Sequence, residues 1–154
     1  MISTQAFKFV LLLFSAAFLV VLFGHVNSVN AQAQAEPARF MYKGLGLGAT
    51  ADEVRQKLGD PKEKTDPQDL FVFSDEESAQ FLYDANKKVT AIMITFSGKL
   101  TGAPTAKDVF GEDVPPKPDG GIFKMVRYPK AGYWISYNKI VGDDSMVSIA
   151  MQKL

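Results

Sequence analysis

The sequence contains no cysteine and only one histidine, His25. Without cysteine the chain can form no disulfide and has no thiol to carry a lipid, so its stability must come from core packing. Ser-His-Asp and Cys-His catalytic systems need a residue that does not occur after position 25. Zinc sites need Cys or His in nearly every form. We therefore expect a protein that is not an enzyme, with no catalytic residue, no metal and no cofactor.

The chain also lacks an excess of either charge, because 17 basic side chains balance 17 acidic ones. A basic stripe is the usual footprint of nucleic-acid binding, so no nucleic-acid partner is expected. The acidic clusters at 75–77, 112–113 and 143–144 show neither the ligand spacing of a calcium loop nor the paired, cleft-flanking carboxylates of a glycosidase. We interpret them as solvated turns.

No apolar run reaches the roughly 20 residues that cross a bilayer. The longest, Phe9 to Phe23, is interrupted by Ser15; a basic start precedes it, and a small-residue stretch ending at Ala35 follows. This order is typical of a secretory signal peptide. We predict a signal peptide over residues 1–35, a periplasmic or secreted protein, and no stable membrane span after cleavage; retention as an anchor is the alternative.

Two helix starts stand out in the remaining sequence. Thr50 with Glu53 forms a capping-box pattern, while Gly59 and Pro61 end the helix between them. The segment 105–111 repeats a Thr-x-x-Asp start and a Gly end in a shorter form. Both patterns predict short helices.

Six strands are predicted from apolar alternation and turn residues, three after each helix. They cover 69–74, 80–84, 89–97, 121–128, 132–138 and 145–153. An offset of about 50 residues brings the two halves into approximate register, as in repeat proteins. We therefore predict an α+β fold. Its first α-β-β-β unit spans 40–98 and its second, degenerate unit 99–154, and the two tandem helix–three-strand units form one antiparallel sheet with short helices on one face.

The stretch Lys43 to Val54 reads K-G-L-G-L-G-A-T-A-D-E-V, and Leu-Gly-Asp-Pro follows at 58–61. This pattern resembles the BamE-like (SmpA/OmlA) envelope proteins and the related tandem-repeat β-lactamase inhibitor proteins. The chain departs from them in lacking a lipidation cysteine and the inhibitors' cysteines. The resemblance implies a non-catalytic protein whose sheet face recognises another protein.

Alternation along the strands divides their side chains between two faces. The face expected under the helices includes Phe71, Phe81, Ile92, Phe123, Met125, Tyr133 and Ile149. The other face is expected to carry an apolar patch that contacts the partner. Its expected binding residues are Trp134, Leu82, Met93 and Val126, with Arg127, Tyr128 and Tyr137 near the strand ends.

These observations predict an exported protein-binding module, either a scaffold, an inhibitor or an assembly factor. Its partner is expected to be a protein in the cell envelope or outside the cell. The alternative is a small-ligand or envelope-polymer binder that stacks its ligand on Trp134, Tyr128 and Tyr137.

Overall fold

The computed structural model describes residues 40–154. The predicted signal peptide lies outside the described residues. Within residues 40–154, no helix combines the length and apolarity needed to cross a membrane.

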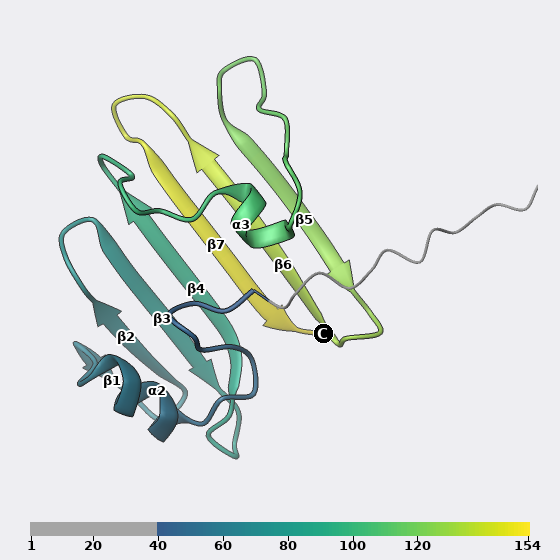
Figure 1. The fold of residues 1–154 in the computed structure, drawn as a ribbon. Coiled ribbons are helices and arrows are strands. Elements are labelled where there is room, and N and C mark those ends of the chain that lie inside the picture. The colour runs from purple at the N-terminus through teal and green to yellow at the C-terminus, as the bar shows by residue number, and fades with distance from the viewer. Residues whose placement is uncertain (1–39) are drawn as a thin grey trace, which may run out of the picture. The chain divides into compact units, whose positions relative to one another are not determined.

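The described chain is built around one seven-stranded antiparallel sheet with the order β1-β2-β3-β4-β7-β6-β5 (Figure 1). The strands are β1 (Glu63–Lys64), β2 (Gln68–Val72), β3 (Glu77–Tyr83), β4 (Val89–Ser97), β5 (Ile122–Tyr128), β6 (Tyr133–Ile140) and β7 (Met146–Lys153). The central pair β4 and β7 joins the two halves of the chain, with Met93 opposite Ala150. The two meanders therefore share one continuous sheet.

The predicted fold of two tandem helix–three-strand units is wrong. The structure is mostly a seven-stranded sheet, and its two helices, α2 (Ala51–Leu58) and α3 (Ala106–Phe110), span only 8 and 5 residues. The additional strand β1 pairs with β2, so the two halves do not repeat the same unit. Helices this short bury few side chains, and loops complete the cover of the sheet.

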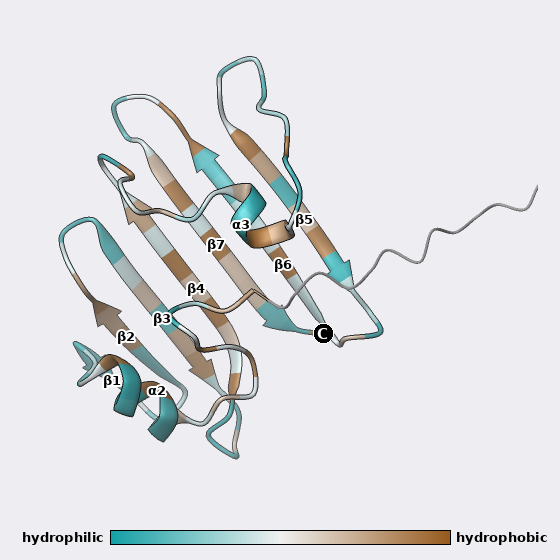
Figure 2. Cartoon of the chain, viewed as in Figure 1, coloured by the Kyte–Doolittle hydropathy of each residue, from teal (hydrophilic) through white to brown (hydrophobic). Residues whose placement is uncertain are grey.

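The core lies between the sheet and these helices and loops. Tyr42 and Leu45, from the loop before α2, are each only 4% exposed and belong to the same buried cluster as Phe81, Ile92 and Ile149. Figure 2 shows brown bands alternating with paler ones along the strands, as expected when one face is buried. We call the side of the sheet that carries α2 and α3 the covered face.

Both predicted helix caps are confirmed. The Glu53 amide donates to the Thr50 hydroxyl at 3.2 Å, and the Thr50 amide donates to the Glu53 carboxylate at 2.7 Å. Thr105 and Asp108 form the same pair at α3. Gly111 ends α3 in the left-handed conformation at φ 75°. This backbone conformation has a higher energy for a residue with a side chain than for glycine.

A buried ion pair attaches α2 to the sheet. The Asp69 carboxylate on β2 is fully buried and accepts two hydrogen bonds from the Arg55 guanidinium, at 2.8 and 3.1 Å. The Tyr83 hydroxyl on β3 donates a third at 2.8 Å. Burial of the Tyr83 hydroxyl is the main cause that raises its pKa, and the hydrogen bond to the Asp69 carboxylate raises it further. The three side chains satisfy one another, so the group is a structural clamp.

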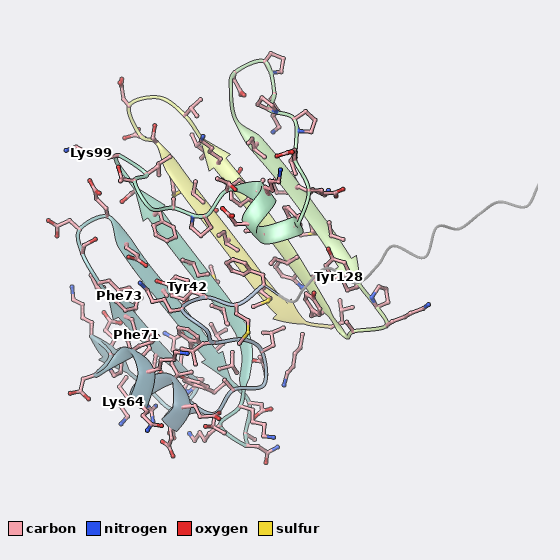
Figure 3. The ribbon with its side chains drawn as sticks, in the orientation of Figure 1. Tyr42, Lys64, Phe71, Phe73, Lys99 and Tyr128 are labelled. Atoms are coloured by element: carbon pink, nitrogen blue, oxygen red, sulfur yellow. The ribbon has the colours of Figure 1, made fainter. Side chains whose placement is uncertain are left out.

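A second polar contact fixes the loop before α2. The Tyr42 hydroxyl and the Lys43 ammonium both contact the Glu77 carboxylate, at 2.6 and 2.9 Å. Burial opposes ionisation of Glu77, but these two hydrogen bonds outweigh it and lower its pKa. The Tyr42 ring packs edge-on against Phe73, and Phe73 stacks on Phe71 (Figure 3). The loop is thereby held onto β2 and β3.

Candidate functional site: the open face of the sheet

The side of the sheet opposite α2 and α3 forms the candidate site, and we call it the open face. The strand pairing places its residues in three rows, since directly paired residues point to the same side. From β2 through β3, β4, β7 and β6 to β5, the rows are Val72-Ser78-Thr95-Ser148-Asn138-Phe123, Leu70-Gln80-Met93-Ala150-Ser136-Met125 and Gln68-Leu82-Ala91-Gln152-Trp134-Arg127. Ser97, Met146 and Ile140 extend the face beyond the first row.

Large apolar side chains on this face are exposed. Val72 is 44% exposed, Met93 50%, Phe123 54% and Met125 51%. Val72 lies on β2, at one side of the face, and Phe123 and Met125 lie on β5, at the other. Small hydroxyl and amide side chains occupy much of the area between these two strands. The face therefore presents apolar flanks around a largely polar but uncharged centre.

The open face carries almost no charge. Among the residues of β2 to β7 that point to this side, Arg127 is the one charged side chain, and Glu63 on β1 lies at the opposite edge. Water-facing sheet surfaces usually carry many charged residues, whereas interface centres lose Lys, Glu and Asp and gain Met, aromatic residues and Arg. Met93, Met125, Met146, Trp134 and Arg127 together match the residue types enriched at interfaces, although the serines and alanines in the rows do not.

Four predicted binding residues lie on the open face. Leu82, Met93, Trp134 and Arg127 point to this side, and Trp134 pairs directly with Arg127 on one neighbour strand and Gln152 on the other. Trp134 and Leu82 are partly buried by their neighbours on the sheet.

The other three predicted binding residues lie on the covered face. Tyr137 is 2% exposed, while Val126 and Tyr128 pack against the core. The Tyr128 ring, labelled in Figure 3, lies 5.0 Å from that of Tyr133. The prediction that these three residues lie beside Trp134 on the partner-binding face is therefore corrected by the strand pairing.

For Val126 and Tyr128 the error arises from the phase of β5, whereas Tyr137 lies on β6 and shares its buried side with Tyr133 and Ile135. The β5–β6 hairpin pairs Tyr128 with Tyr133 and Val126 with Ile135, so the even-numbered residues of β5 face the core. Phe123 and Met125, expected under the helices, instead lie on the open face. Both phases of β5 contain apolar residues, so alternation did not distinguish them. Lys124 fits the covered face because its ammonium contacts Glu112 and lies 5.1 Å from the Phe110 ring centre.

A hollow of about 760 Å³ lies apart from the open face, beside the glycine-rich approach to α2. Its two charged side chains already have partners, since Glu53 caps α2 and the Lys57 ammonium donates to the Gly44 carbonyl at 3.4 Å. Across residues 40–154, no group of three or more His, Cys, Asp or Glu side chains is arranged to hold a metal. The open face is thus the better candidate.

Comparison with known proteins gives little further guidance. No protein-family model matches the sequence, and no curated protein matches it. A crystal structure of YjgB, a DUF4309 family protein from Bacillus subtilis, aligns with a TM-score of 0.43 and 18% identity, covering 69% of this chain and 79% of that one. That similarity is too weak to support an argument. None of these findings concerns the BamE-like proteins, so that resemblance stays a prediction.

Proposed function

We propose that this protein is an exported, non-catalytic protein-binding module whose open face contacts another polypeptide. The observation that carries the proposal is the composition of that face, which exposes Met93, Phe123 and Met125 yet bears a single charge across β2 to β7. Exposed apolar surface of this kind is usually covered in the working protein. A sheet face that contacts only water can carry Lys, Glu and Asp at its centre without an energetic cost. Their absence from this face is therefore better explained by a partner that covers it.

The alternative of a small ligand stacked on three aromatic rings has less support. Trp134 lies on the open face, but Tyr128 and Tyr137 lie on the covered one, so the three rings do not share a platform. The open face is also a sheet surface rather than a concave pocket, and small-molecule sites are usually concave. A polypeptide surface suits it better.

The test compares Met93→Lys with Met41→Lys. Both residues are about equally exposed, at 50% and 54%, but Met41 lies in the loop beside α2, away from the open face. Each variant is expressed from the full coding sequence and its complexes are measured by native mass spectrometry after gentle isolation. Circular dichroism and a thermal melt verify that each variant folds.

We expect the wild type and Met41→Lys to be isolated in the same complex and Met93→Lys to be isolated without it. An ammonium at Met93 would have to be desolvated at the centre of the interface, and an unpaired buried charge is strongly unfavourable. If folded Met93→Lys keeps every complex that Met41→Lys keeps, the open face is not the binding surface.

A further inference from the structure

We propose that the polypeptide covering the open face is a second copy of this chain, packed face to face as a two-layer β-sandwich. This inference rests on the proposed function and names its partner. The area of the face, the match between its two halves and the position of its two charges all favour this partner.

The area fits a stable dimer. Strands lie about 4.8 Å apart and rise about 3.4 Å per residue, so six strands of about seven residues make a face of roughly 700 Å². Two such faces in contact would remove roughly 1,400 Å² from water, within the range of about 1,200–2,000 Å² for specific complexes. The exposed Met93, Phe123 and Met125 would all lie within this area.

The face is complementary to itself under one simple symmetry. A two-fold axis between the sheets, parallel to the strands and above the β4–β7 boundary, sets β2 opposite β5, β3 opposite β6 and β4 opposite β7. Each residue then faces a residue of its own row. Such isologous contact is the commonest arrangement in homodimers.

Apolar residues meet apolar residues in this arrangement. Val72 faces Phe123 and Leu70 faces Met125, which brings together the apolar flanks of the two copies. Leu82 faces the larger ring of Trp134, since both lie in the same row on β3 and β6. At the centre, the long Met93 side chain faces the small Ala150. Large side chains thus meet smaller ones where the layers are closest.

Polar residues also meet polar residues. The opposed polar pairs are Ser78 with Asn138, Gln80 with Ser136, Thr95 with Ser148 and Gln68 with Arg127, while Gln152 faces Ala91. Hydroxyl and amide side chains can both donate and accept, so these pairs can satisfy one another when water is excluded. Aligned sheets cross at about 30°, so the match holds best near the centre of the sandwich.

The two charges on the open face lie at positions that the two-fold symmetry brings close to each other. Arg127 is on β5 at one edge of the sheet, and Glu63 is on β1 at the other. The two-fold axis brings the β5 edge of one copy to the β1 edge of its partner. Opposite charges therefore share the rim, and like charges do not meet in the interior.

The experiment combines sedimentation velocity with methionine oxidation by dilute peroxide, read by peptide mass spectrometry over a range of protein concentrations. Met41 is 54% exposed away from the face and Met151 is 1% exposed in the core, so the chain supplies both an accessible and a protected reference. The protein is purified from cells expressing the full coding sequence. The same oxidation is repeated on intact cells.

We expect a concentration-dependent dimer. As the dimer forms, oxidation of Met93 and Met125 should slow by about tenfold while Met41 keeps its rate. The folded Met93→Lys variant should remain monomeric where Met41→Lys dimerises. These results together would support face-to-face packing.

Two results would overturn the inference. One is a protein that stays monomeric at every concentration. The other is a dimer in which Met93 oxidises as fast as Met41, which indicates pairing through a surface other than the open face. The cellular measurement separates this inference from the proposed function: a monomer whose Met93 is protected in cells refutes only the second-copy partner, whereas a monomer whose Met93 is reactive in both settings refutes both proposals.

Discussion

Replacing Arg55 with methionine should destabilise the protein far more than its position on a surface helix suggests. Methionine keeps an apolar stem of similar length and removes the charge that Asp69 needs. The Asp69 carboxylate is fully buried and would retain only the hydrogen bond from Tyr83, at 2.8 Å. The variant therefore leaves a buried anion without its counter-charge.

The expected cost follows from that geometry. Breaking a buried ion pair by removing one partner costs about 3–5 kcal/mol, and the lower end applies because the Arg55 side chain is 25% exposed and water can partly replace it. Tyr83→Phe removes one hydrogen bond to a charged acceptor and should cost about 1.5–3 kcal/mol. Adding Asp69→Asn to Arg55→Met should recover part of the loss, because the second change removes the unpaired charge.

Urea unfolding followed by far-ultraviolet circular dichroism measures these free energies, provided that the slopes agree between variants. A domain of this size is expected to be stable by roughly 6–15 kcal/mol, so the variants should remain folded at low denaturant. The reasoning is refuted if Arg55→Met costs less than about 1 kcal/mol. It is equally refuted if the double variant is no more stable than Arg55→Met.

Three further predictions concern a helix cap, a carboxylate and the single tryptophan. Thr50→Ala removes the hydroxyl that caps α2 and should cost about 1 kcal/mol in a thermal melt, whereas Thr101→Ala in an exposed loop should change little; equal effects would contradict the cap. Because the folded-state pKa of Glu77 is lowered, its contribution to stability is present above the unfolded pKa of about 4.3 and is lost as pH falls through the folded value. Glu77→Gln should therefore flatten the acid limb of a stability-versus-pH curve, and an unchanged slope would count against this contact. Iodide should quench Trp134 in dilute protein and quench it less as the concentration rises, while complete protection at the lowest concentration would place the ring under other residues.

The local predictions succeeded where neighbouring residues carried the information. The capping boxes at Thr50 and Thr105 form as expected, and the strand expected over 89–97 matches β4 from end to end. Leu82, Met93 and Trp134 were assigned to the open face because their strands alternate clearly. In each case the deciding interaction spans a few residues along the chain, so the sequence pattern contains it.

The missed features depend on partners far along the chain. Strand β1 is two polar residues, Glu63 and Lys64, with no apolar alternation, and it exists because β2 offers a free edge. Phe123 and Met125 were assigned to the wrong face because both phases of β5 contain apolar side chains. Asp69 shows no sign in the sequence that it is buried, since its counter-charge is 14 residues away on α2.

By itself, the sequence determined which segments become strands, apart from β1, where the two helices begin and end, and that no thiol is available for chemistry or crosslinking. These properties follow from backbone preference, short-range capping and composition. The tertiary structure decided the strand order, the β4–β7 junction and the phase of β5. It therefore also decided which side chains gather on the nearly uncharged open face, because hydrogen bonds between strands that are distant along the chain bring those side chains into common rows.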